Sequence, residues 1–205
     1  MNKGLIQIDQ FYCDHLGVNV NDEKDVRNFS IRSQNGHGLL NYLLHKSFYD
    51  EDAHLMRTYL VRDISSDEIV GYFSLKAGLV STEEQEIEIY NTDSNEPSTR
   101  ITFDTIPGIE LANFAVNSAY IAKHPGISGV GLFIFDSFIL PITRQVSTEI
   151  GAFVLYIFSL PFEKLIDRYK KYGFMRLEKE YEDKLHKRLK PEYDQSCIFM
   201  YRPLE

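Results

Sequence analysis

Three glycines ahead of an apolar helical pattern give the strongest chemical signal in the sequence. Gly126, Gly129 and Gly131 follow the apolar stretch 109–116, and the helical pattern begins among them, at Gly129. A strand that leads through a glycine-bearing loop into a helix directs backbone N–H groups and the positive end of the helix dipole to one point. Glycines also let a phosphate approach the backbone closely. The segment predicts a phosphate site, although an ordinary tight turn explains it equally well.

Two motifs resemble the GNAT superfamily of N-acetyltransferases. The segment Gly126–Gly131 is similar to motif A of that family, whose loop reads Gln/Arg-x-x-Gly-x-Gly/Ala, with Gly126 where the family usually has Gln or Arg. About forty residues later, Tyr169–Phe174 matches the family signature Tyr-x-x-x-Gly-Phe, and Phe162 stands where many members carry Asn. The resemblance spans roughly residues 57–201. It implies an α/β (mixed α+β) GNAT fold, in which helices flank a twisted, mostly antiparallel sheet.

The resemblance also implies acetyl-coenzyme A (acetyl-CoA) as the acetyl donor. In the family, backbone groups at the end of the strand before motif A pair with the pantetheine arm and can stabilise an oxyanion, while the loop amides bind the pyrophosphate. The Ser128 hydroxyl is as well suited to cap the helix as to bind the pyrophosphate. The predicted cofactor-binding residues are Phe114, Ala115, Val116, Gly126, Ile127, Ser128, Gly129, Val130 and Gly131.

Glu110 is the predicted catalytic base. A lysine amine is mostly cationic at neutral pH, with a pKa of about 10.4, so acetyl transfer benefits from a base that removes a proton. Glu110 stands six residues before Val116, at a position similar to that of a catalytic Glu in the histone-acetylating branch of the family. A polar residue at the exposed start of a strand is the alternative interpretation.

Tyr169 is the predicted general acid. The family often uses the Tyr of this motif to protonate the thiolate of coenzyme A. A phenol with a pKa of about 10 can donate to a thiolate whose conjugate acid has a pKa near 8.5. The alternative is that Tyr169 only completes an apolar stripe with Phe162 and Ile166, and Tyr172 would replace it if the motif were misaligned.

Hydrophobic periodicity predicts the elements that position these residues. Residues 38–49 form an amphipathic helix, 57–62 and 69–79 form a hairpin, and 109–116 form a buried strand. Pro125 and Gly126 disfavour regular structure in the loop 117–128. Further along the chain we expect an apolar helix from Gly129 with its regular bonding interrupted at Pro141, a strand over 152–158, a helix between Pro161 and Gly173, a charged helical tail over 178–190 and a strand over 197–201.

Residues 1–205 read as one domain with insertions near 82–104 and 178–194. The first insertion is acidic and polar, and a short strand over Glu86–Tyr90 fits its alternation. The second carries the pairs Glu180–Lys184 and Asp183–Lys187, which are spaced for helical ion pairs. Solvated surface is the simplest interpretation of both.

Net charge, the spacing of histidines and cysteines, and the length of apolar segments limit which kinds of partner and site we expect. The net charge of −8 disfavours nonspecific nucleic-acid binding and suits a cationic substrate. His124 lies in the loop without a paired carboxylate, which favours a solvent-facing role, and the histidines and two cysteines show no metal-ligand spacing. No secretory signal is visible, and the apolar stretch 151–162 is too short to cross a membrane. We therefore expect a cytoplasmic protein without a metal or a membrane partner.

Three functions follow from these observations. The first is an N-acetyltransferase that transfers acetyl from acetyl-CoA to a small-molecule or protein amine through a ternary complex. The second is a toxin-like GNAT enzyme that acetylates aminoacyl-tRNA, because residues 70–75 and 106–116 resemble that branch and basic residues recur over 164–171. The third is a module that binds coenzyme A without turnover. The family is often dimeric, which allows a homodimer, and the acceptor amine is not identified by any motif.

Overall fold

The computed structural model describes residues 10–90, 97–186 and 196–204, with the backbone alone for residues 82–90 and 97–103. Its centre is a seven-stranded sheet in the order β1-β2-β3-β4-β5-β7-β6. Among the described strands only β4 and β5 pair in parallel, which confirms the expected mixed α+β fold with a mostly antiparallel sheet. The strands are β1 (Phe11–His15), β2 (Arg57–Asp63), β3 (Ile69–Tyr90), β4 (Pro97–Val116), β5 (Val154–Ser159), β6 (Met175–Arg176) and β7 (Ile198–Pro203).

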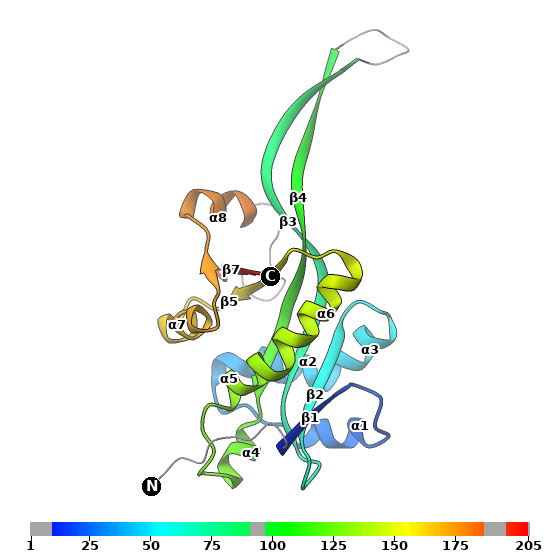
Figure 1. Cartoon of the computed structure of the whole chain (residues 1–205), viewed down its shortest axis with the longest axis vertical. Helices are drawn as coiled ribbons and strands as arrows, with labels where there is room; N and C mark the ends of the chain where they lie inside the picture. Colours follow the sequence, from blue (N-terminus) through cyan, green and yellow to red (C-terminus); the bar gives the residue numbers. More distant parts are fainter. Residues whose placement is uncertain (1–9, 91–96, 187–195, 205) are drawn as a thin grey trace.

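Helices flank the sheet and cover apolar side chains on both of its faces (Figure 1). Ile109 and Leu111 of β4 belong to the core cluster formed with α4, α5, α6 and α7. Tyr72 packs on the opposite face with α2, and Phe199 packs with α8. The helices are α1 (Asp22–Asp25), α2 (His37–His45), α3 (Ser47–Asp52), α4 (Ser118–Lys123), α5 (Val130–Ile134), α6 (Leu140–Ile150), α7 (Glu163–Lys171) and α8 (Lys179–His186), with 3-10 turns η2 (Val26–Asn28) and η3 (Gln34–Gly36) and a π-helical turn η4 (Phe135–Ile139).

The early amphipathic helix, expected as one element, is two. Helix α2 ends before Lys46, whose φ of −120° is not helical. The buried Ser47 hydroxyl donates a hydrogen bond of 2.6 Å to the Leu43 carbonyl, which a continuing helix would offer to a backbone N–H. The chain therefore turns at Lys46 and starts again as α3.

Helices α5 and α6 form one run with η4 between them. Pro141 has no N–H to donate to a carbonyl one turn earlier, and the regular bonding gives way to the π-helical turn just before it, as expected. Residues Val130–Ile150 are, within the described part of the chain, the one helical run long and apolar enough by length and composition to cross a membrane. Ile134, Phe135 and Ile139 are fully buried in the protein core, which accounts for part of this apolar character, whereas Leu132 and Ile150 of the same run are exposed.

The first insertion is the outer half of a long hairpin. Strands β3 and β4 pair outward to Tyr90↔Pro97, with register shifts after Ser74 and Ser81, so the short strand expected over Glu86–Tyr90 is part of a much longer ladder. We call residues 81–104 the arm. Figure 1 shows the arm extending beyond the rest of the molecule. The second insertion begins as α8, in which the Glu180–Lys184 ion pair forms at 2.9 Å; Lys187 and the remainder up to 194 lie outside the described residues.

The loop 117–128, expected to be irregular, contains helix α4. Asn117 caps this helix, because its side-chain oxygen accepts a hydrogen bond of 3.0 Å from the Ala119 N–H. The Asn117 side chain also accepts from the Ser30 N–H and donates to the Ile69 carbonyl, which fixes the cap to two other segments. Pro125 and Gly126 follow the helix and do not interrupt it. The expectation was wrong because Asn117 starts a short helix before the chain reaches the turn residues Pro125 and Gly126.

Candidate functional site

Strands β4 and β5 separate beside the predicted site. Their parallel pairing runs only from Gly108↔Val154 to Glu110↔Tyr156. Beyond Glu110, β4 pairs with β3 and β5 pairs with β7. Half of the backbone groups of an antiparallel strand point away from its partner. Residues 111–116 therefore present N–H and C=O groups toward the gap, and this stretch contains three of the predicted cofactor-binding residues, Phe114, Ala115 and Val116.

The glycine loop opens on free space next to this end of β4. Gly129 is the N-cap of α5 and adopts the left-handed conformation, with φ of 79°. A Cβ added at Gly126 or Gly129 would meet no heavy atom within 4 Å, so a ligand can approach the backbone there. A Cβ at Gly131 would lie 3.7 Å from a methyl group of Val116, which places the helix start against the end of β4. This arrangement fits the phosphate site predicted for Gly126, Ile127, Ser128, Gly129, Val130 and Gly131.

Two expectations for this loop are wrong. Gly129, not Ser128, is the N-cap of α5, and no side chain caps that helix. His124 does not simply face solvent: its ring stacks on Tyr120 at 4.1 Å between centroids, and its Nδ1 lies 2.9 Å from the Tyr120 carbonyl. Both contacts of His124 are with Tyr120 of α4, a helix that the turn residues in this loop led us not to expect.

Glu110 occupies the last paired position before the two strands separate. Its neighbours Ile109 and Leu111 pack in the core on one face, so by strand alternation its half-buried side chain lies on the other face. The Tyr156 hydroxyl is 3.5 Å from Glu110 Oε2. Burial raises the pKa of the Glu110 carboxyl, and the positive charge of Lys76 and the Tyr156 hydrogen bond partly offset that rise. A carboxylate with a raised pKa is a stronger base, as the predicted role requires.

Tyr169 lies on the opposite face, on α7, at the edge of the core formed with α5 and α6. Its ring makes edge-on contacts with Tyr172 and Phe174, at 5.9 and 5.6 Å between centroids. Burial raises its pKa, so the phenol stays protonated at neutral pH, the form that a general acid needs. Phe162 is 44% exposed and does not join the expected apolar stripe. Within the described residues, no hydrogen bond or ring contact joins Tyr169 and Glu110.

Tyr172 borders the glycine loop. Its hydroxyl would lie 3.2 Å from a Cβ at Gly131, and its ring stacks on Phe135 at 4.7 Å. Gly173 ends the helix as expected, with φ of 83° and a hydrogen bond from its N–H to the Lys170 carbonyl. The signature Tyr-x-x-x-Gly-Phe therefore positions α7 beside the start of α5.

Sequence reasoning missed Tyr156 and Lys76. Both flank Glu110 in the sheet, Lys76 on β3 and Tyr156 on β5. The available signal was weak: Tyr156 is the one residue with a polar tip in the apolar run 154–158. The pairing that brings these side chains together depends on strand register, which the sequence did not provide.

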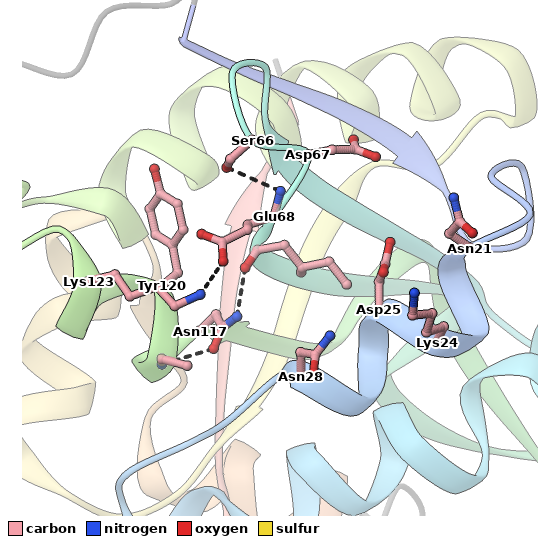
Figure 2. Close-up of a pocket in the computed structure, with 12 residues that line it drawn as sticks. Asn21, Lys24, Asp25, Asn28, Ser66, Asp67, Glu68, Asn117, Tyr120 and Lys123 are labelled. Atoms are coloured by element: carbon pink, nitrogen blue, oxygen red, sulfur yellow. Dashed lines mark hydrogen bonds and ion pairs between the residues drawn. The ribbon is translucent and has the colours of Figure 1, made fainter.

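A polar pocket of about 550 Å³ lies elsewhere (Figure 2). It is enclosed by α1 and η2, the turn between β2 and β3, and the start of α4. Lys123 forms an ion pair with Glu68 across it. None of the predicted site residues lines it. Among the described residues, no group of three His, Cys, Asp or Glu side chains is arranged to hold a metal ion.

Comparisons with known proteins identify the fold. No protein-family model and no curated protein sequence matches the chain. Solved structures do match. A mutant of KacT has a TM-score of 0.62 at 14% identity, with 95% of each chain covered. The AtaT mutant toxin bound to the C-terminus of the antitoxin AtaR and acetyl-CoA has a TM-score of 0.57 at 14% identity, covering 96% of this chain and 94% of that chain.

A third match is AtaT complexed with acetyl-methionyl-tRNAfMet, with a TM-score of 0.58 at 14% identity and 94% of each chain covered. At such low identity the likeness concerns the backbone and not the side chains of a site. These structures share the sheet and helices described above over almost the whole chain. The chain has the GNAT fold.

Proposed function

We propose that this protein is an N-acetyltransferase that uses acetyl-CoA to acetylate an amine. The observation that carries the proposal is the separation of β4 and β5 next to an open glycine loop at the start of α5. In this proposal, backbone groups of residues 111–116 pair with an extended pantetheine arm, and the loop amides bind the phosphates. The comparison with AtaT bound to acetyl-CoA, a protein of the same fold, supports the same ligand.

The proposed reaction needs one base and one acid. Glu110 accepts a proton from the amine, whose nitrogen forms a bond to the acetyl carbon. A backbone N–H of the stretch Phe114–Val116 stabilises the oxyanion. The C–S bond then breaks, and Tyr169 donates its proton to the departing thiolate. Glu110 and Tyr169 lie on opposite faces of the sheet, so they approach the reacting group from its two sides.

The acceptor in a second candidate function is the α-amine of an aminoacyl-tRNA. AtaT complexed with acetyl-methionyl-tRNAfMet has the same fold. The exposed side chains Lys164, Arg168 and Lys171 also gather on α7, where they can contact phosphates. An α-amine has a pKa of about 7.7–8.0 and is partly neutral at physiological pH. This acceptor would therefore depend less on Glu110 than a lysine amine would.

Calorimetric titration with acetyl-CoA tests the donor site. We expect saturable binding by the wild-type protein and a Kd at least about tenfold weaker in Gly126→Glu, because a carboxylate would face the phosphates (tenfold corresponds to about 1.4 kcal/mol). Gly38→Glu is the matched control: Gly38 also borders open space, on α2, and should leave the Kd unchanged. Failure of folded wild-type protein to bind would refute the proposal.

An acceptor screen with polyamines, peptides and charged tRNA then separates the candidates. Acetylation of charged tRNA that Lys164→Glu and Lys171→Glu weaken, while Lys46→Glu on the other side of the sheet does not, would establish the tRNA function. Acetylation of a polyamine or peptide alone would establish the first function. Binding of acetyl-CoA without turnover of any acceptor would favour the non-catalytic module.

A further inference from the structure

We propose that Tyr156 is a positioning residue for Glu110. Its hydroxyl holds the Glu110 carboxylate at the last paired position of β4 and β5, and two glycines, Gly78 and Gly108, keep the tyrosine in place. The inference rests on the proposed function, in which Glu110 is the base. It adds a residue and a structural device to that site.

The side chains involved form a row across three strands. Lys76 on β3 lies opposite Glu110 on β4, and Glu110 lies beside Tyr156 on β5. Tyr156 is only 3% exposed, and its hydroxyl is 3.5 Å from Glu110 Oε2. Tyr156 can donate its proton to the carboxylate, whereas Lys76 is exposed and forms no ion pair with Glu110 among the described residues. The neutral phenol is thus the partner in closest contact.

Two glycines make room for the tyrosine. Gly78 and Gly108 lie directly opposite each other in the β3–β4 ladder, two positions along from Lys76 and Glu110 and therefore on the same face of the sheet. A Cβ at Gly78 would lie 1.9 Å from the Tyr156 hydroxyl oxygen, and a Cβ at Gly108 would lie 3.1 Å from the ring. Glycine weakens a strand interior, so its use at two facing positions indicates a close approach. The Tyr156 side chain lies across the backbone that these glycines leave bare.

The electrostatic consequence has a definite sign. Burial raises the pKa of Glu110, and the charge of Lys76 and the Tyr156 hydrogen bond lower it. Among the described residues, Lys76 and Tyr156 are the titratable groups that shift the pKa of Glu110. Loss of the tyrosine hydroxyl removes a donor that favours the charged carboxylate, so the pKa of Glu110 must rise further. A base with a higher pKa becomes protonated at a higher pH and loses activity there.

The test is an NMR titration of the Glu110 side-chain carboxyl carbon in the free protein. In Tyr156→Phe we expect the pKa to rise by about 0.5–1 pH unit, the effect of one hydrogen bond. Gly78→Ala should give a similar rise, because its methyl group displaces the hydroxyl while the tyrosine is retained. In a Tyr156→Phe background, Gly78→Ala should add little further shift. Lys76→Met should raise the pKa independently of both.

An unchanged Glu110 pKa in folded Tyr156→Phe or in folded Gly78→Ala would overturn the inference. Circular dichroism establishes folding, and the two variants reach the same hydrogen bond by independent routes, so a folding failure of one leaves the other decisive. The titration needs no acetyl-CoA, so it separates two failures. A shifted pKa in a protein that acetylates nothing supports the Tyr156–Glu110 contact and refutes the proposed function. In an active protein, the acidic limb of the kcat profile should move upward with the pKa.

Discussion

Tyr169 and Tyr172 are three positions apart, but their environments give them different roles. The Tyr172 ring stacks on Phe135, and its hydroxyl borders the backbone of Gly131. The Tyr169 ring contacts Tyr172 and Phe174 only by its edges. The hydroxyl of Tyr169 forms no hydrogen bond within the described part of the chain. The ring of Tyr169 therefore packs at the edge of the core, and its hydroxyl can take the general-acid role that we propose.

Tyr169→Phe should separate these roles. The ring and its packing remain, so the thermal midpoint and the Kd for acetyl-CoA should stay close to the wild-type values. The proton donor is lost, so kcat should fall by about 10²–10⁴-fold. Tyr172→Phe is the matched control and should keep kcat within a few-fold of the wild-type value. Steady-state kinetics with an acceptor from the screen measure both; a larger loss in Tyr172→Phe would mean that the motif is aligned one turn out of place.

The sequence predicted the local elements of the candidate site and missed the parts that depend on strand register. The glycine loop and the Tyr-x-x-x-Gly-Phe signature are contiguous, so their spacing alone predicted the elements that carry them. Tyr156 lies 46 positions from Glu110, and only the pairing of β4 with β5 brings the two together. The same limit applies to Gly78 and Gly108, because only the strand pairing brings Tyr156 against them.

Helix α1 shows how an element too short to be stable alone is held in place. It has four residues and is fixed by Arg62 of β2, whose side chain is fully buried. The guanidinium donates to Asp22 at 2.6 Å and to Asp25 at 3.0 Å. It also donates to the Asp67 carbonyl in the turn between β2 and β3. This network joins three segments around the polar pocket, and periodicity gave no sign of it.

Arg62→Met should therefore be strongly destabilising. The substitution leaves the buried Asp22 carboxylate, 2% exposed, without its cation. We expect a loss of about 3–5 kcal/mol in the free energy of unfolding at neutral pH. Arg27→Met is the control, since Arg27 pairs with Glu23 in solvent and should cost less than about 1 kcal/mol. Urea denaturation of both variants measures the difference, and equal losses would show that the buried network contributes little.

At the scale of the whole molecule, charge and shape divide the protein into two parts. The arm contains seven acidic residues and one arginine, so it accounts for −6 of the net charge of −8. The rest of the chain is nearly neutral. The acidic net charge is thus a property of the arm, and it says little about binding at the β4–β5 gap. The sequence already places these acidic residues in the first insertion, and the pairing of β3 with β4 shows that this insertion is the outer part of a hairpin.

This division predicts that the arm can be shortened without loss of the donor site. Replacing residues 82–104 by Asn-Gly joins the paired residues Ser81 and Thr105 through a sequence suited to a two-residue hairpin turn, and the backbone pairing that it removes is that between β3 and β4. The elements that position Glu110, Tyr169 and the glycine loop remain. We expect a cooperative thermal transition and a Kd for acetyl-CoA within about twofold of the wild-type value (less than about 0.5 kcal/mol). Calorimetry on the shortened and full-length proteins measures this, and a folded, shortened protein that no longer binds would place part of the donor site on the arm.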